Sequence, residues 1–160
     1  MTRRAVLFVC LGNICRSPTG EGVLRALVES RGLADRIDID SAGTGSWHVG
    51  ESSDPRMREA AERRGYRLDS IARQVAEDDF ERFDLLVAMD RSNLDDLHAK
   101  APAGTDLARI RLLSEFLDGD WPQEVPDPYY GGAEGFDYVL DMIESAGPRL
   151  IDHLLEDDEP

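Results

Sequence analysis

The sequence predicts an α/β fold in which a parallel sheet is covered by helices on both faces. Two observations predict this class. First, apolar segments such as "AVLFV" and "FDLLVAM" are continuously hydrophobic, which is typical of strands that are buried on both faces. Second, these segments alternate with stretches whose apolar residues recur at three- and four-residue spacing, as they do in helices. Strands that alternate with helices form a parallel sheet between two helical layers.

The first half of the chain is predicted to contain two strands and two helices. The buried strand at 5–9 leads through a glycine-containing loop into a helix that begins at Ser17 and is stopped by Gly32. "IDIDSA" at 37–42 predicts the second strand, and the loop "GTGSWHVGESSDP" follows it. A second helix is expected at 55–64, because a glycine directly after it supplies a stop.

The second half adds two strands and the longest helix. "FDLLVAM" at 83–89 predicts a third buried strand, after which Asp90 is placed to cap a helix through "SNLDDLHA". "RIRLL" at 109–113 predicts a short fourth strand. After a long loop, an apolar stripe at 136–154 predicts an amphipathic helix, in which a Gly-Pro pair is expected to allow a kink.

The length of the chain indicates a single domain over residues 1–160, because dividing it would leave two marginal cores. Four strands and about five helices then predict a three-layer sandwich with a four-stranded parallel sheet in a flavodoxin-like arrangement. The acidic end of the chain, 156–160, is expected to be frayed.

Composition excludes several classes of function. The formal charge of −15 argues against a nucleic-acid or anionic-membrane surface, although a locally positive pocket can exist within an acidic protein. The longest apolar stretches are too short to span a bilayer, and no cleavable signal pattern follows the first strand. We therefore expect a cytoplasmic protein with no membrane partner, and we expect a monomer.

Two cysteines and three histidines provide little material for a metal site. Cys10 and Cys15 cannot form a four-ligand zinc site, and a bridge between them would close only a very small loop. The histidines are far apart in the sequence and lack the spacing of metal ligands. We expect neither a metal nor another cofactor.

The segment "VCLGNICRSP" predicts a phosphate-binding loop between the first strand and the first helix. A helix that begins after such a loop presents backbone N–H groups to an anion. Gly12 and Asn13 tolerate the left-handed dihedral angles that the loop needs, and Arg16 can bind a tetrahedral anion with two parallel hydrogen bonds. Ser17 suits the N-cap of the helix. The phosphate-binding residues are expected to be Leu11, Gly12, Asn13, Ile14, Cys15 and Arg16.

Cys10 lies directly before this loop, where a thiol would serve as a nucleophile. The helix terminus, Arg16 and the loop amides all favour the thiolate, and the Ser17 hydroxyl can donate to the sulfur. A buried structural cysteine would not need these surroundings. A phosphate bound in the loop would meet a sulfur that is already ionised.

Two further loops are predicted to join the phosphate-binding loop at the carboxyl edge of the sheet. One of these loops carries Trp47 and His48, and the other carries Tyr129 and Tyr130. These aromatic residues would form the walls of a pocket for a flat ring of the ligand. Leu11 and Ile14 are expected to add apolar lining. Asp127 in "VPDPYY" fits two roles equally well on this evidence, a turn residue or a general acid.

Several segments of the chain resemble the low-molecular-weight protein tyrosine phosphatase family. They are "VCLGNICRSP", "SAGTGSWHVG", "ARQV", "MDRSN" and "DPYYGG", and they occur in family order from residue 5 to about 152. The resemblance implies a cysteine-dependent phosphatase that forms a cysteinyl-phosphate, with phosphotyrosine-containing proteins as substrates and inorganic phosphate as product or inhibitor. It implies Cys10 as nucleophile, Arg16 as the group that binds transition-state charge, and Asp127 as general acid and later general base.

The resemblance also implies supporting roles around the loop. Asn13 and Ser17 would hold the loop and the thiolate, Ser41 would support Asn13, and Asp90 would act either as a further support or as a plain helix cap. Many family members carry a histidine where this chain has Ser70, so the bracing of the loop is expected to be weaker or differently made.

Cys15 is implied to be a redox partner of Cys10. A reversible disulfide between the two would switch the enzyme off and protect the nucleophile. An inert side chain packed under the loop is the alternative reading.

Three other functions share parts of this pattern. Arsenate reductases of this fold relay a disulfide through further cysteines, which this chain lacks outside the loop. Protein-arginine phosphatases typically have threonine where Ile14 stands and lack the paired tyrosines. A non-catalytic phosphotyrosine-binding module would not need Asp127. All three alternatives are weaker than the tyrosine phosphatase hypothesis.

Overall fold

The computed structural model describes residues 3–129 and 131–156. The predicted fraying of the acidic end falls mainly on 157–160, outside the described residues. In chain order the elements are β1 (Arg4–Cys10), α1 (Arg16–Ser30), β2 (Ile37–Gly43), α2 (Pro55–Glu62), α3 (Asp79–Arg82), β3 (Leu85–Ala88), α4 (Arg91–Lys100), β4 (Ile110–Leu112) and α5 (Ala133–Leu155). Short 3₁₀ helices at Leu107–Arg109 and Leu113–Phe116 flank β4.

The four strands form one sheet in the order β2-β1-β3-β4, and every neighbouring pair is parallel. Val9 of β1 pairs with Ala42 on one side and Ala88 on the other, so β1 lies between β2 and β3. The predicted parallel α/β sheet is confirmed. Because the strands are parallel, the loops after β1, β2 and β4, which carry the predicted pocket residues, leave from the same edge.

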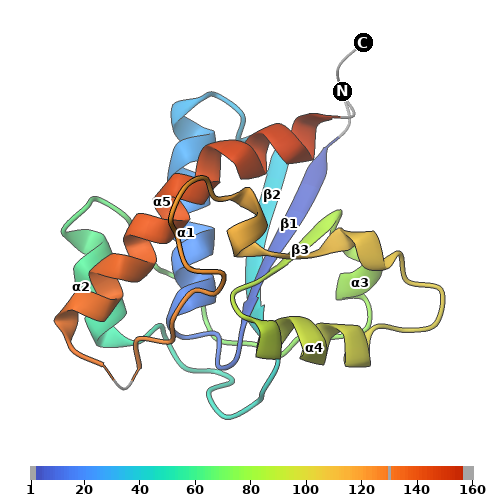
Figure 1. Cartoon of the computed structure of the whole chain (residues 1–160), viewed down its shortest axis with the longest axis horizontal. Coiled ribbons are helices and arrows are strands. Elements are labelled where there is room, and N and C mark those ends of the chain that lie inside the picture. Colours follow the sequence, from blue (N-terminus) through green and yellow to red (C-terminus); the bar gives the residue numbers. More distant parts are fainter. Residues whose placement is uncertain (1–2, 130, 157–160) are drawn as a thin grey trace.

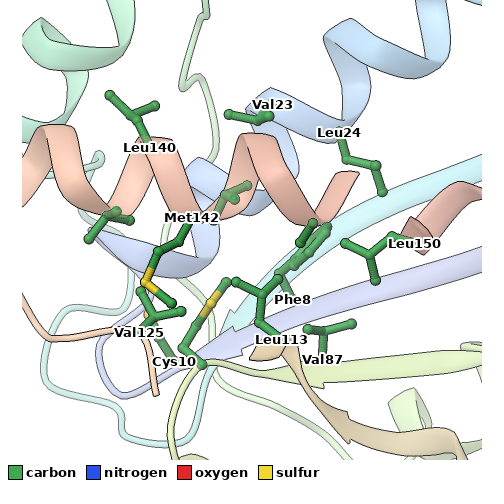
Figure 2. Packing of buried hydrophobic residues seen from close by; sticks show 14 of the residues in the cluster. Phe8, Cys10, Val23, Leu24, Val87, Leu113, Val125, Leu140, Met142 and Leu150 are labelled. Carbon is green, nitrogen blue, oxygen red and sulfur yellow. The ribbon is translucent and has the colours of Figure 1, made fainter. Parts of the chain in front are cut away.

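Helices cover both faces of this sheet, and successive residues of β1 point to opposite layers (Figure 1). Val6 and Phe8 pack with α1, α2 and α5, whereas Leu7 and Val9 pack with α3 and α4. Figure 2 shows Phe8 in the first layer, among side chains that come from the helices above the sheet. This two-sided burial explains why the β1 sequence is continuously apolar rather than alternating.

Some element boundaries differ from the sequence prediction. The strand expected at 83–89 is limited to Leu85–Ala88. Phe83 is the C-cap of α3, a four-residue helix that is too short to show periodicity. The helix expected at 55–64 ends at Glu62.

The final helix extends from Ala133 to Leu155 and contains the Gly-Pro pair. A Cβ atom at Gly147 would lie 3.0 Å from the Leu27 side chain, so this glycine allows α5 to pack closely on α1. None of the helices in the described part of the chain is long and apolar enough to cross a membrane.

Candidate active site

The loop between β1 and α1 wraps tightly, with Cys10 as the last residue of β1 and Arg16 as the first of α1. Among the described non-glycine residues, only Asn13 has a positive φ, at 59°. Of the two residues that tolerate left-handed dihedral angles in this loop, Asn13 therefore adopts one and Gly12 does not. Gly12 is instead a point of close approach, because a Cβ atom there would lie 2.8 Å from the His48 ring.

The Asn13 side chain holds the loop through three hydrogen bonds. Its Nδ2 group donates to Ser17 Oγ at 2.9 Å and to Ser41 Oγ at 3.0 Å, while its Oδ1 accepts from the backbone N–H of Arg73 at 3.0 Å. Ser41 in turn donates to the buried carboxylate of Glu21 at 2.6 Å. Each polar atom of this buried amide therefore has a partner, which stabilises the unusual φ of Asn13.

Arg73 connects the Asn13 side chain to two neighbouring elements of the fold. Within the described residues, the Ser70 side chain makes no hydrogen bond. The Arg73 guanidinium forms ion pairs with Asp79 at 2.9 Å and Asp40 at 3.1 Å, so its backbone is tied to both α3 and β2. Asn13 is thus braced through the Arg73 backbone, and the expectation that Ser70 alters the bracing of the loop stays a prediction.

The Cys10 sulfur is buried and has two polar neighbours from Ser17. The Ser17 hydroxyl lies 2.9 Å from the sulfur, and the Ser17 backbone N–H donates to it at 3.4 Å. Because Asn13 donates to the Ser17 oxygen, the hydroxyl proton is free to be donated, with the sulfur at 2.9 Å and the Ala42 carbonyl at 3.4 Å as its acceptors. Both donors stabilise negative charge on Cys10.

Arg16 is buried beside two carboxylates. Its Nη1 donates to Asp90 Oδ2 at 2.6 Å and to the Val125 carbonyl at 3.0 Å, and its Nη2 lies 3.7 Å from Asp127 Oδ2. Burial lowers the pKa of the guanidinium, but the charges on Cys10, Asp90 and Asp127 outweigh burial and raise the pKa overall. Arg16 therefore carries a positive charge beneath the loop.

Asp90 serves both of the roles that were considered for it. One carboxylate oxygen accepts from the backbone N–H of Asn93 and caps α4, while the other accepts from Arg16. The same side chain can therefore end a helix and fix the orientation of the guanidinium.

A pocket of about 350 Å³ opens above the loop and receives side chains from all three loops at the carboxyl edge. Its described lining consists of Cys10, Leu11, Gly12, Ile14, Cys15, Arg16, Trp47, His48, Asp127 and Tyr129. Tyr130, which was also predicted to line the pocket, lies outside the described residues.

The walls of the pocket differ in exposure. Trp47 is 72% exposed and stands at the rim, whereas Ile14 is buried near the floor. The centroids of the His48 and Tyr129 rings are 6.2 Å apart and the ring planes are tilted by 46°, so the two loops meet at this wall. Asp127 is partly exposed, and its Oδ1 accepts from the Tyr129 backbone N–H at 3.0 Å.

Cys15 lies in the same pocket, and its thiol is buried. Burial raises the pKa of its thiol well above the usual range, and the nearby negative charges of Asp54, Cys10 and Asp127 add to this effect. Cys15 is therefore a neutral thiol at physiological pH.

Sequence reasoning missed several residues that organise this site, namely Glu21, Asp54, Arg56 and Arg73. Asp54 accepts from the backbone N–H of Arg56 as the N-cap of α2, and Pro55 is the first residue of that helix. An Asp followed by a Pro is a readable helix start, so this signal was present in the sequence. The contacts of Glu21 with Ser41 and of Arg73 with Asn13 join residues 20 and 60 positions apart, and they had no comparable local signal.

Comparison with known proteins identifies the family. The model of the family described as "Low molecular weight phosphotyrosine protein phosphatase" matches residues 5–159. A low molecular weight protein-tyrosine-phosphatase from Streptomyces coelicolor is 48% identical over 155 residues, which cover 94% of this chain and 93% of the relative.

Solved structures of such proteins share the fold. A protein tyrosine phosphatase from Entamoeba histolytica superposes with a TM-score of 0.92 at 42% identity, covering 98% of this chain and 99% of that one. A drosophila arginine phosphatase superposes with a TM-score of 0.86 at 34% identity, covering 92% and 96%. Because the family match extends over nearly the whole sequence, this chain belongs to the low molecular weight phosphotyrosine protein phosphatase family.

Proposed function

We propose that this phosphatase hydrolyses phosphotyrosine and other aryl phosphate monoesters through a cysteinyl-phosphate on Cys10. The observation that carries the proposal is the position of the Cys10 sulfur, which lines one pocket together with Arg16 and Asp127. A phosphate bound above Cys10 would have a nucleophile on one side and a proton donor on the other.

In the first step, the Cys10 thiolate attacks phosphorus. The S–P bond forms as the bond to the leaving oxygen breaks, and protonated Asp127 gives its proton to that oxygen. Arg16 and the backbone N–H groups of residues 11–16 hold the three equatorial oxygens, where negative charge collects in the transition state. The products of this step are the free phenol and the phosphorylated cysteine.

In the second step, water attacks the cysteinyl-phosphate. Asp127, now ionised, takes a proton from the water, the S–P bond breaks, and the electron pair returns to the Cys10 sulfur. Inorganic phosphate leaves, and the Ser17 hydroxyl and backbone N–H stabilise the regenerated thiolate. Neither step calls for a metal or a cofactor.

The pocket walls favour an aryl substrate. Tyr129 and His48 flank the opening, with Trp47 at the rim, and their rings can contact the faces of a flat ligand. A phosphoserine side chain is too short to bring its phosphorus to the pocket floor while its backbone stays outside. Ile14 on the floor offers apolar contact rather than a hydrogen bond, which is less suited to a guanidino group.

A substrate panel tests this proposal. We expect wild-type protein, without added metal, to hydrolyse 4-nitrophenyl phosphate and a phosphotyrosine peptide, with little activity on phosphoserine or phosphoarginine. Because a drosophila arginine phosphatase shares this fold, phosphoarginine is the informative competitor. A preference for phosphoarginine would overturn the assigned substrate class, and binding without turnover of any ester would favour a phosphotyrosine-binding module.

We further propose that the protein acts as a monomer in the cytoplasm on phosphotyrosine-containing proteins. A reducing compartment suits an enzyme whose nucleophile must stay a free thiol, since both cysteines are unpaired in the structure.

Cys15 is proposed to protect the nucleophile from oxidation. Peroxide would convert the Cys10 thiolate to a sulfenic acid, and the Cys15 thiol would then displace water from it to form a disulfide. After peroxide treatment followed by dithiothreitol, we expect wild-type protein to regain most of its activity and a Cys15→Ala variant to regain several-fold less. Equal irreversible loss in both proteins would contradict this role.

A further inference from the structure

The segment that carries Asp127 is fastened to helix α2 by one arginine. We propose that Arg56 is a positioning residue that holds the general acid in place; this inference rests on the proposed function. Arg56 Nη2 donates to the Tyr129 carbonyl at 3.1 Å. The Tyr129 backbone N–H donates to Asp127 Oδ1 at 3.0 Å. The backbone of one residue, Tyr129, therefore links Arg56 to the catalytic carboxylate.

Ring contacts strengthen this attachment. The Arg56 guanidinium carbon lies 5.3 Å from the centre of the Tyr129 ring and 5.0 Å from the centre of the Phe136 ring. Tyr129 is at the end of the acid-bearing segment and Phe136 is in the first turn of α5. Arg56 thus contacts both sides of the turn that follows Asp127, close to where α2 lies beside the start of α5 (Figure 1).

Asp54 fixes the orientation of the same guanidinium. Its carboxylate accepts from Arg56 Nε at 3.1 Å and from Nη2 at 2.9 Å. The Asp54 side chain is buried, and its backbone N–H donates to the Ile14 carbonyl in the phosphate-binding loop at 2.8 Å. The path Ile14–Asp54–Arg56–Tyr129–Asp127 therefore fixes the acid relative to the loop that binds phosphate.

The geometry around Asp127 explains why such a link matters. With Oδ1 held by Tyr129, the other oxygen, Oδ2, faces Arg16 at 3.7 Å, on the pocket side of the carboxylate. Asp127 is 40% exposed and belongs to no helix or strand, so its placement depends on few contacts. Small misplacement of a proton donor weakens its catalysis strongly.

The dependence of kcat/KM on the leaving group of the ester separates this role from a merely structural one, which would not change that dependence. A phenolate is a poorer leaving group than a 4-nitrophenolate, so kcat/KM for phenyl phosphate depends more strongly on proton donation. We expect Arg56→Gln to raise the ratio of kcat/KM for 4-nitrophenyl phosphate to that for phenyl phosphate about fivefold, as expected for loss of one half-exposed charged contact. Asp127→Asn should raise the same ratio further.

Two further variants test whether the positive charge of Arg56 or the planar geometry of its guanidinium is required. Arg63→Gln removes the same charge from the end of α2, where Arg63 pairs only with the exposed Glu59 among the described residues, and the ratio should stay at the wild-type value. Arg56→Lys keeps the charge but cannot hold Asp54 and the Tyr129 carbonyl together, so the ratio should rise as it does in Arg56→Gln. A wild-type ratio in Arg56→Lys would overturn the inference.

A double variant decides whether Arg56 acts through Asp127. In the Asp127→Asn background, adding Arg56→Gln should leave the ratio of kcat/KM for the two esters unchanged. In Arg56→Gln alone, the inhibition constant for inorganic phosphate should change less than twofold. An equal loss for both esters, or a large loss of phosphate affinity, would place the effect in the phosphate-binding loop and overturn the inference.

If wild-type protein turns over aryl esters but Asp127→Asn leaves the ratio unchanged, the acid assignment fails and the inference fails with it. If wild-type protein hydrolyses no aryl ester, the proposed function itself fails.

Discussion

Cys10→Ser should lower kcat for 4-nitrophenyl phosphate by about 10⁴-fold or more, which is the scale seen when a covalent nucleophile is removed. The Ser17 hydroxyl and N–H lie 2.9 and 3.4 Å from the Cys10 sulfur and can stabilise a thiolate. A serine hydroxyl ionises far less readily than a thiol, so the same donors cannot supply an alkoxide. Steady-state hydrolysis assays, with enzyme concentrations high enough to detect the residual rate, measure this change.

Binding provides the control for this variant. The loop, Arg16 and the Asn13 hydrogen bonds do not depend on the sulfur for their attachment to the fold, so Cys10→Ser should still bind inorganic phosphate with affinity within a few-fold of wild type. Residual turnover within tenfold of wild type would contradict the role of Cys10 as nucleophile.

Arg16→Lys should reduce kcat/KM for aryl phosphates by about 10³-fold, the lower end of the effect of an arginine that stabilises phosphoryl transfer. The guanidinium contacts Asp90, the Val125 carbonyl and the edge of Asp127 from a buried position. A lysine ammonium is a point charge on a flexible chain and cannot make these contacts while also binding two phosphate oxygens. The variant therefore keeps the positive charge but loses the hydrogen-bonding geometry of the guanidinium.

Arg63→Lys, directly after α2, is the matched control for Arg16→Lys, since Arg63 is exposed and does not line the pocket. It should leave kcat/KM within twofold of wild type, because exposed ion pairs contribute little. A drop of less than about tenfold in Arg16→Lys would show that positive charge alone suffices, contrary to the bidentate role.

The parts of the site that could be predicted from sequence are those with local signals. The apolar strand, the loop and the helix start place Cys10 and Arg16 within seven residues of each other, so their proximity needs no long-range contact. Asp90 was likewise readable, because an aspartate directly before a helix is a common cap. The parallel sheet followed from the alternation of buried strands and helices, since such strands leave few other topologies.

The parts that could not be predicted depend on contacts between distant segments. Asn13 and Arg73 are 60 residues apart, and Arg56 and Tyr129 are 73 residues apart. A half-exposed arginine on a helix has the same appearance in the sequence whether it contacts solvent or supports a catalytic loop. The close approach at Gly12 had no local signal for a related reason, because it comes from the His48 ring and not from the glycine's own dihedral angle.

The central claim is that phosphoryl transfer passes through Cys10, and identification of the covalent intermediate tests it most directly. Wild-type protein would be mixed with excess 4-nitrophenyl phosphate, quenched during turnover in neutral denaturant, digested and analysed by mass spectrometry. We predict one added phosphoryl group on the peptide that contains Cys10, located on the sulfur by fragmentation, and none in a sample quenched after the substrate is exhausted and phosphate removed. Turnover with no phosphoryl group on the protein, or with the group on a residue other than Cys10, would contradict the account.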